Sequence, residues 1–230
     1  MESLDDVTIA FIFRFIPLEI LLQQVNRVCR RFNEIIETHS ILWQNFEFTE
    51  SVSIDAFTLD KILRKRARLF RSFCVPDSVN EIPAPDIDYQ LHLLSSANKL
   101  VWLDLTGAQI STLYFLKPLK ALEVLIIDTC KNISSCDVKV IKDCPNLEHL
   151  YMGYTNVEGG CIVNIVPPKV HTLECSGINF TLESLYAVLE AYNNQLLFLT
   201  VTIVPIPDTN TISALKDQFS DVTLSINQCL

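Results

Sequence analysis

The stretch Leu147-Glu148-His149-Leu150-Tyr151-Met152 decides the fold, because its apolar residues follow the spacing apolar-x-x-apolar-x-apolar. The same spacing recurs six more times, beginning at Phe70, Leu100, Leu122, Val170, Leu196 and Phe219. Successive motifs begin 30, 22, 25, 23, 26 and 23 residues apart, in order along the chain. A repeat of nearly constant length predicts a solenoid in which each unit contributes one short strand and stacks on its neighbours.

The connections between these strands carry weaker signals. Thr181 precedes the periodic apolar residues of 182–192 and is placed to cap a helix there, and a second helical pattern covers residues 59–70. Three prolines, Pro76, Pro83 and Pro85, predict a surface loop inserted over residues 76–90. Residues 159–168 contain few helix signals, so we expect an irregular connection there.

The residues between the apolar anchors of each strand are expected to face the open, concave side of the solenoid, because side chains alternate along a strand. They form columns across the sheet, of which the first ends at Asp221 and the second at Thr223. Aromatic side chains anchor many protein interfaces, and carboxylates favour a partner segment with Lys or Arg. The candidate substrate-binding residues are Trp102, Asp104, Asp128, His149, Tyr151, Glu174 and Phe198. In the alternative interpretation, a loop or a chain end covers this face.

The first fifty residues have a different pattern. Apolar residues at positions 9, 12, 13 and 16 recur at helical spacing after an acidic cap at Asp5, which predicts one buried stripe that ends at Pro17. A second helical pattern runs from Leu18 to Ile36. Two or three helices of this length bury too little surface to stand alone, so part of their apolar surface is expected to contact a neighbour.

This N-terminal segment resembles an F-box. The resemblance rests on the runs Ile12-Phe13-Arg14-Phe15-Ile16-Pro17, Leu21-Leu22, Val28-Cys29-Arg30-Arg31-Phe32 and Leu42-Trp43. The F-box is a small helical domain that docks on the Skp-type adaptor of cullin-RING ubiquitin ligases. The resemblance implies adaptor contacts at Leu4, Ile12, Pro17, Leu22, Val28, Cys29 and Trp43. In the alternative interpretation, these residues form the core of a helical cap on the following domain.

The repeats resemble the cysteine-containing subtype of leucine-rich repeats, which is typical of F-box proteins with leucine-rich repeats. Cys130-Lys131-Asn132-Ile133-Ser134 and the segment from Asp143 to Leu150 carry this resemblance. Together the two resemblances imply an α/β protein with a helical F-box over residues 1–48. A right-handed leucine-rich-repeat solenoid of about seven repeats follows over residues 49–230, with a parallel concave sheet and a helical or irregular convex side.

Composition argues against several classes of function. The 230 residues include 18 basic and 27 acidic side chains, and the net charge of −9 repels nucleic acid and anionic lipid. Charges and a proline interrupt the apolar stretch over residues 7–22, so we expect neither a membrane span nor a secretion signal. The eight cysteines form no Cys-x-x-Cys pair, and we expect reduced thiols in a cytoplasmic or nuclear protein.

No motif predicts catalysis, a cofactor or a metal. The sequence lacks the P-loop, GxGxxG, GxSxG and HExxH patterns, and the intervals between Cys130, Cys136 and Cys144 do not suit zinc. A catalytic or metal-binding group could be drawn from His149, Asp128 and Glu174, but neighbouring strands of any repeat protein bring polar side chains together. We therefore expect a non-catalytic chain.

The resemblance implies a substrate-recognition subunit of a Skp-cullin-F-box ubiquitin ligase. The F-box would hold the adaptor and, through it, a cullin, while the concave face would hold a protein substrate for ubiquitination and proteasomal degradation. The mechanism is proximity, and the bond chemistry belongs to other subunits. The alternative function is a leucine-rich-repeat scaffold with an F-box-like head and no ligase role.

Overall fold

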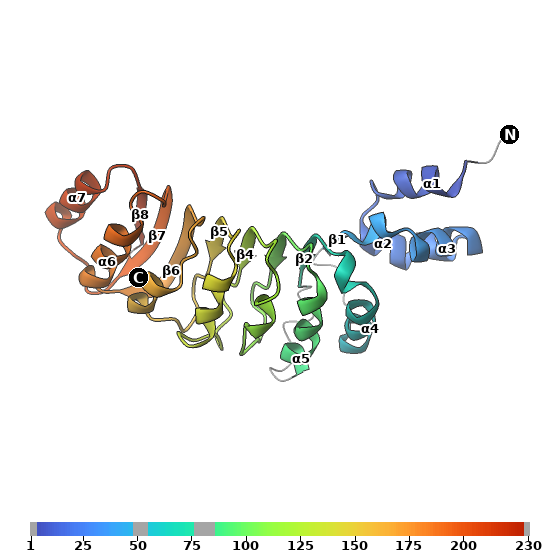
Figure 1. Ribbon diagram of the computed structural model, residues 1–230, viewed down its shortest axis with the longest axis horizontal. Helices are drawn as coiled ribbons and strands as arrows, with labels where there is room; N and C mark the ends of the chain where they lie inside the picture. The colour runs from blue at the N-terminus through green and yellow to red at the C-terminus, as the bar shows by residue number, and fades with distance from the viewer. Residues whose placement is uncertain (1–3, 48–54, 76–85, 228–230) are drawn as a thin grey trace.

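A computed structural model describes residues 4–47, 55–75 and 86–227. Within these residues, a parallel sheet of eight strands runs in the order β1 to β8, and every strand pairs with its neighbours in sequence. The strands are β1 (Asn45–Phe46), β2 (Ser72–Cys74), β3 (Trp102–Asp104), β4 (Val124–Ile126), β5 (His149–Tyr151), β6 (Thr172–Phe180), β7 (Phe198–Ile203) and β8 (Thr223–Asn227). The chain therefore has the α/β leucine-rich-repeat fold that the sequence predicts, drawn out into an elongated molecule (Figure 1).

One column of apolar side chains fixes the register of the sheet. The middle residues of successive strands pair directly, and the column runs through Phe73, Leu103, Leu125, Leu150, Leu173, Leu199 and Leu224. All of them except Leu224 are at most 1% exposed. Because side chains alternate, a slip by one residue would turn this column toward solvent, so the apolar spacing sets the register.

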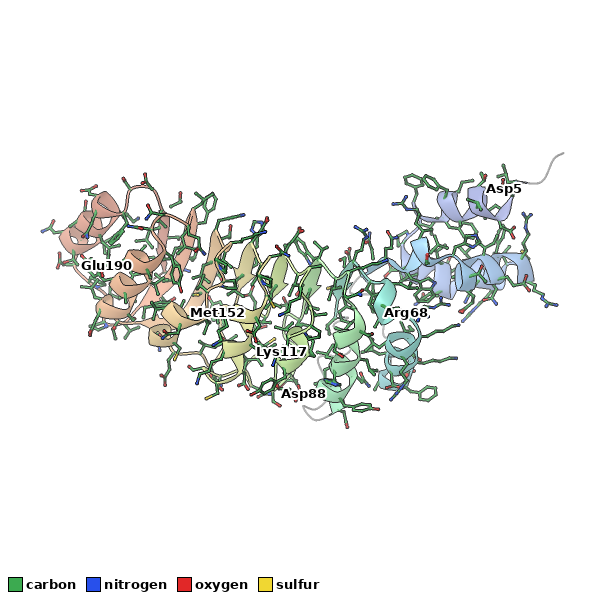
Figure 2. The ribbon with its side chains drawn as sticks, in the orientation of Figure 1. Asp5, Arg68, Asp88, Lys117, Met152 and Glu190 are labelled. Carbon is green, nitrogen blue, oxygen red and sulfur yellow. The ribbon has the colours of Figure 1, made fainter. Side chains whose placement is uncertain are left out.

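Helices and 3-10 turns occupy the connections between the strands. They are α4 (Ala56–Arg66), η3 (Ala67–Leu69), α5 (Asp86–His92), η5 (Leu93–Ser96), η6 (Tyr114–Leu116), η7 (Asp137–Asp143), η8 (Gly159–Asn164), α6 (Leu182–Tyr192) and α7 (Thr209–Gln218). Figure 2 shows Asp88 and Lys117 on the convex side that α5 and its neighbouring connections form. The predicted cap of α6 is confirmed, since Thr181 Oγ1 accepts a 3.1 Å hydrogen bond from the Ser184 N–H.

Two predictions about the connections need correction. The loop predicted over residues 76–90 is wrong for residues 86–90, which belong to α5. Ile87 and Gln90 are buried there, and Gln90 Nε2 donates a 2.9 Å hydrogen bond to the Ala56 carbonyl, so this segment packs against α4. Residues 76–85 lie outside the described residues. The connection over 159–168, expected to be irregular, contains the 3-10 helix η8.

The last strand is displaced by two residues from its predicted position. Thr223 pairs with Phe198, where the sequence pattern placed Asp221, and Ser225 pairs with Thr200. The reason is a turn: the Val222 N–H donates a 3.0 Å hydrogen bond to the Phe219 carbonyl, so the chain enters the sheet only after the turn. In this last repeat the spacing identified the strand, but Leu224 rather than Val222 joins the column of middle residues.

The N-terminal helices form what we call the head, residues 4–43. It contains α1 (Asp6–Phe13), α2 (Leu18–Gln23), η1 (Val25–Arg27), α3 (Arg30–Thr38) and η2 (Ser40–Trp43). The single helix predicted from residue 18 to residue 36 is broken, because Cys29 is extended, with φ −158°. The break lets α3 fold back on α1, where the Phe13 and Phe32 rings meet edge to face at 5.1 Å.

The head is joined to the repeats without a gap in the sheet. Strand β1 lies before residue 48, where sequence analysis divides the chain, and it pairs with β2. The rings of Phe46, Phe70 and Phe73 are fully buried, with centroids 5.0 to 5.7 Å apart. The division of the chain at residue 48 stays a prediction, but its two sides share a sheet and a core.

A polar interlock, by which we mean the hydrogen-bonded ion pair of Glu37 and Arg66, strengthens the same junction. Arg66 of α4 is 8% exposed and donates 2.7 Å hydrogen bonds to the carbonyl and a carboxylate oxygen of Glu37 in α3. Its guanidinium lies 4.6 Å from the ring centroid of Trp43, whose Nε1 donates to the Ile36 carbonyl. Burial opposes ionisation of Glu37, but the hydrogen bonds and charges of Lys65 and Arg66 outweigh it and lower the pKa of this carboxyl.

Replacing Arg66 tests whether this interlock stabilises the junction. We expect Arg66→Ala to lower the free energy of unfolding by about 2 kcal/mol, since it removes buried hydrogen bonds to a charged group. Arg64→Ala on the same helix is the matched control, since Arg64 contacts Asp60 and Tyr89 only at the exposed surface and should contribute clearly less to stability. Urea unfolding followed by circular dichroism measures both, and equal effects would contradict a special role for Arg66.

Candidate interaction surfaces

The open face of the sheet is the first candidate surface, and it carries the predicted aromatic anchors. Trp102 on β3 and Phe198 on β7 are 43% and 52% exposed. The register places both in one column, four strand spacings or about 19 Å apart. Tyr151 on β5 is half-buried, while Val124, which lies next to Trp102 in the column, is only 8% exposed. Two separated aromatic anchors suit an extended partner segment that lies across the strands.

A hollow over the first strands extends this face toward the head. It has a volume of about 590 Å³ and is lined by Asn45, Glu47, Ser72, Cys74, Trp102 and Asp104. Sequence reasoning missed Asn45 and Glu47 because β1 was not predicted. The signal was present, since Trp43, Phe46 and Phe48 follow the same apolar spacing as the other seven motifs.

Three predicted carboxylates lie along the open face. Asp104 Oδ1 accepts 2.9 Å and 2.6 Å hydrogen bonds from the N–H and hydroxyl of Thr106. Asp128 Oδ1 accepts a 2.6 Å bond from the Gly153 N–H, and Glu174 Oε1 accepts a 3.1 Å bond from the Ser176 N–H. None of the eight described strands contains Lys or Arg, so no strand residue neutralises this row. The face is therefore negative and suits a cationic partner.

A glycine brings two of these carboxylates close together. A Cβ atom at Gly153 would lie 2.8 Å from Glu174 Oε2 and 3.3 Å from Asp128 Oδ1, so a larger residue would separate them. Burial raises the pKa of Asp128 to about 6, and the negative charges of Glu174 and Asp104 act in the same direction. The hydrogen bond from Gly153 opposes the rise without cancelling it. Asp128 is thus half-protonated near pH 6.

A row of left-handed residues forms the edge of this face, and sequence reasoning missed it. Gly107, Thr129, Tyr154 and Gly177 have φ angles of 74°, 58°, 56° and 72°, each in the turn after a strand or within its bulge. Gly177 also makes room for a neighbour, because a Cβ there would lie 2.5 Å from Tyr154 Cδ1. Only the two glycines gave a signal in the sequence, since L-residues adopt this conformation rarely.

The head presents the second candidate surface. Leu4, Ile12 and Val28 are 54%, 48% and 68% exposed, Pro17 and Cys29 are exposed, and Leu22 is half-buried. Ile12 was expected on the buried stripe of the first helix, but Ile9, Ala10 and Phe13 fill that stripe instead. Phe11 and Phe15, which the resemblance did not mark as contacts, are 54% and 85% exposed. An apolar surface of this kind is typical of a protein interface.

Trp43 does not belong to this surface. It is 3% exposed and lies under Arg66, so the adaptor contact that the F-box resemblance implies at this position does not fit the structure. The physical reason is its place in the repeat pattern, where it precedes β1 as Phe70 precedes β2. Trp43 is an anchor of the solenoid core.

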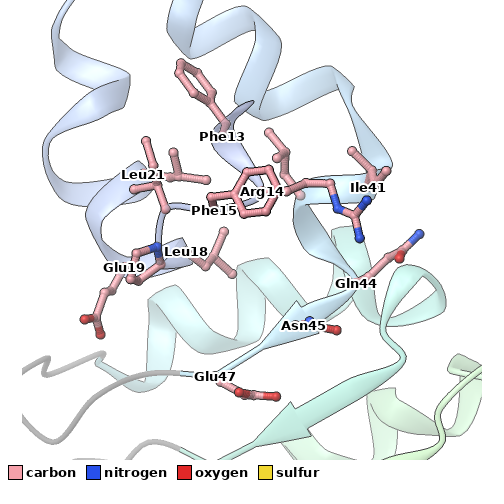
Figure 3. A pocket seen from close by; sticks show the side chains of 13 residues that line it. Phe13, Arg14, Phe15, Leu18, Glu19, Leu21, Ile41, Gln44, Asn45 and Glu47 are labelled. Atoms are coloured by element: carbon pink, nitrogen blue, oxygen red, sulfur yellow. The ribbon is translucent and has the colours of Figure 1, made fainter. Parts of the chain in front are cut away.

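A pocket of about 440 Å³ separates the head from the first strand. Phe13, Phe15 and Leu18 line it from the head, and Gln44 and Glu47 line it from the start of the sheet. Figure 3 shows Arg14 and Phe15 on the head side of this pocket and Asn45 and Glu47 on the strand side. The pocket connects the apolar surface of the head to the negative end of the open face.

Three buried cysteines belong to the core of the repeats. They are Cys130, Cys144 and Cys175, each with a free thiol, while Cys229 lies outside the described residues. Burial raises the pKa of Cys130 to about 12 and of Cys144 to about 11, and raises that of Cys175 well above its usual value. Cys130 Sγ donates to the Leu105 carbonyl of the preceding repeat at 3.0 Å. These three thiols therefore stay protonated and serve the core.

His149 lies with different partners from those considered in the sequence. The structure groups it with Glu148 and His171, and their potential ligand atoms lie within 4.8 Å of one another. Asp128 and Glu174, the carboxylates considered with it, instead face each other across Gly153.

Comparisons with known proteins do not assign this chain to a family. No family model matches the chain, and no curated protein sequence matches it. Among solved structures, internalin C2 of Listeria monocytogenes is similar, with 15% identity and a TM-score of 0.46 over 76% of this chain and 84% of that one. A leucine-rich-repeat protein of Leptospira interrogans is similar with 11% identity and a TM-score of 0.40, over 85% of this chain and 56% of that one. Values this low say nothing about what this chain binds.

In the described part of the chain, no helix has the length and apolar character needed to cross a bilayer. The chain is a repeat scaffold whose open face and head are two separate surfaces suited to protein partners.

Substituting Asp128 tests whether burial and the neighbouring carboxylates Glu174 and Asp104 make its charge unfavourable. Its folded pKa of about 6 is above the usual value of an aspartate, so its stabilising contribution is complete only below the unfolded pKa of about 3.9 and is lost as the pH rises through 6. Asp128→Asn keeps an oxygen that can accept from Gly153 but carries no charge. We expect it to raise the free energy of unfolding at pH 7.5 by about 1 kcal/mol, after allowance for solvent screening, and to leave it nearly unchanged at about pH 3, where the carboxyl is protonated in both states.

Urea unfolding at both pH values measures this difference. Asp221→Asn, at an exposed aspartate, controls for the change in net charge and should have no effect at either pH. A destabilised Asp128→Asn protein at pH 7.5 would show that the carboxylate is favourably placed and that its pKa is not raised.

Proposed function

We propose that this chain is the substrate-recognition subunit of a Skp-cullin-F-box ubiquitin ligase. The observation that carries the proposal is the exposure of the F-box-like positions on the head: Leu4, Ile12 and Val28 leave about half or more of their apolar surface in contact with water. Burying one such side chain at an interface contributes about 1.5–3 kcal/mol. Together with Leu22 and Pro17 they would sustain a stable complex with a Skp-type adaptor.

The junction supports a role in positioning. Shared strand pairing through β1, the buried rings around Phe46 and the Glu37–Arg66 interlock fix the head against the first repeats. A substrate bound on the open face would therefore be held at a constant orientation to an adaptor bound on the head. Proximity of this kind raises the effective concentration of substrate lysines near the ubiquitin carrier without any chemistry by this chain.

The open face supports the second half of the proposal. Trp102 and Phe198 offer aromatic anchors, Asp104 lies on the same strand as Trp102, and Asp128 and Glu174 lie on the repeats between the anchors. The substrate class that fits is a protein with an extended segment that combines apolar residues with Lys or Arg. A cation next to Asp128 would lower the pKa of its carboxyl and release a proton, so binding should strengthen as the pH rises through 6.

A second function is favoured by one observation. Trp43, half of the Leu-Trp pair in the F-box-like pattern, is explained completely by its place in the solenoid core. The presence of Trp43 therefore supports the ligase subunit no more than it supports a second function. That function is a leucine-rich-repeat scaffold whose head caps the solenoid and binds no ligase adaptor.

Charged substitutions on the head decide between the two functions. We expect Ile12→Asp and Val28→Asp each to weaken binding to the Skp-type adaptor of the same organism by about 100-fold, because about 3 kcal/mol of apolar burial is lost. Phe57→Asp, at a residue of α4 that is 78% exposed, is the matched control and should bind as the wild type does. Calorimetry with purified proteins measures the affinities.

Both head substitutions are at exposed positions, so the unfolding midpoint should not change. If the wild-type chain does not bind the adaptor, the capping scaffold is the correct function. If it binds and both head variants bind equally well, the contact positions implied by the resemblance are wrong.

Loss of the aromatic anchors should release the substrate but not the adaptor. Proximity labelling in cells under proteasome inhibition compares the proteins near the wild-type chain with those near the double variant Trp102→Ala, Phe198→Ala. We expect a set of proteins labelled by the wild type to be absent with the double variant. Tyr114→Ala, at an aromatic residue of η6 that is 75% exposed on the convex side, is the control and should retain that set. Identical labelling by all three proteins would exclude the open face as the substrate site.

A further inference from the structure

We propose that Glu148, His149 and His171 form a binding site for a divalent zinc-type metal ion at the edge of the open face. One potential ligand atom from each of the three residues lies within 4.8 Å of the other two. Two of the four histidines in the chain meet here, with ring centroids 4.6 Å apart and planes at 85°. The site lies beside the proposed substrate face, but it does not depend on the ligase function.

The backbone holds the three residues in place. Glu148 and His171 occupy equivalent positions in adjacent repeats, and the His171 and Thr172 N–H groups donate 3.0 Å and 3.2 Å hydrogen bonds to the Glu148 carbonyl. His149 begins β5 and pairs with Thr172 of β6. The Cα atoms that carry the ligands are thus fixed by sheet pairing, which is the arrangement that rigid metal sites require.

The side chains leave ligand capacity unused. His149 Nδ1 is buried and has no hydrogen-bond partner in the described structure. His171 Nδ1 lies 3.2 Å from the Thr172 hydroxyl, which can fix the orientation of the ring, while His171 Nε2 lies 3.8 Å from Glu148 Oε2, too far for a hydrogen bond. A metal ion between Glu148 Oε2 and His171 Nε2 would bind two groups that make no direct hydrogen bond to each other, and His149 would supply a ligand nitrogen beside them.

Geometry and ligand type point to zinc. Tetrahedral zinc with bonds of about 2.0–2.1 Å needs ligand atoms about 3.4 Å from one another, so the present separations of up to 4.8 Å must close by up to about 1.4 Å. Glu148 and His171 have side chains 44% and 32% exposed, which leaves them free to rotate by that amount. Two imidazoles and a carboxylate are borderline ligands that zinc accepts, and the fourth position would stay open to water or to a side chain of a bound protein.

Zinc binding to the purified chain alone tests the site. We expect calorimetry to find one zinc ion per chain and zinc to raise the thermal unfolding midpoint, with EDTA reversing the shift. His171→Ala and Glu148→Gln should each weaken binding by more than the 10–100-fold that loss of an outer-shell partner costs. His92→Ala, at an exposed histidine of α5, is the matched control and should bind zinc as the wild type does.

Cobalt distinguishes this site from the cysteines. Co²⁺ bound by histidine and carboxylate gives visible d–d bands without the near-ultraviolet charge-transfer band of thiolate ligands. We expect that spectrum from the wild type and its loss in His171→Ala, with both proteins shown to be folded by circular dichroism. The proposal is overturned if zinc does not bind, if the variants bind unchanged, or if a thiolate band appears. None of these results would affect binding of a Skp-type adaptor to the head.

Discussion

The whole molecule depends on the stacking of one apolar residue per repeat on the same residue of the next repeat. A single repeat cannot bury its middle leucine, because one face of that side chain is covered only by its neighbour. The column from Phe73 to Leu199 therefore forms the centre of the core and also fixes the register of neighbouring strands. Every side chain on the open face takes its position from this column, including the carboxylates and the two separated aromatic anchors.

Side chains that bond to the preceding repeat reinforce this stacking on the convex side. Asn132 donates to the Gln109 carbonyl at 3.2 Å, Asn146 to the Lys120 carbonyl at 2.8 Å, and the Cys130 thiol to the Leu105 carbonyl. These bonds join the side chains of one repeat to backbone carbonyls in the connection of the preceding repeat, where regular helices do not supply the donors. They also explain why small polar residues and cysteines recur at fixed places in the repeat without forming a metal site or a nucleophile.

The sequence predicted the repeats, their apolar spacing and the open face, because burial leaves a strict trace in residue type. It did not predict features set by local backbone geometry. The break at Cys29 and the turn before Thr223 both preserve the apolar pattern while changing which residues face inward. The left-handed conformation of Thr129 and Tyr154 has no sequence signal, because residues other than glycine adopt it only where the surrounding structure imposes it. The grouping of Glu148 with His171 appears only once the register aligns their repeats.

Trp43 shows how the two parts of the chain are combined. Its residue type fits the F-box-like pattern that ends the head, and its position fits the first repeat of the solenoid. One side chain cannot both line an adaptor interface and fill the core, and the structure assigns it to the core, under the guanidinium of Arg66. Other apolar residues of the head, such as Val28 and Ile12, are exposed and remain available to a partner. As a result, the residues that fix the head to the solenoid are separate from those free to bind a partner, and either function can change without loss of the other.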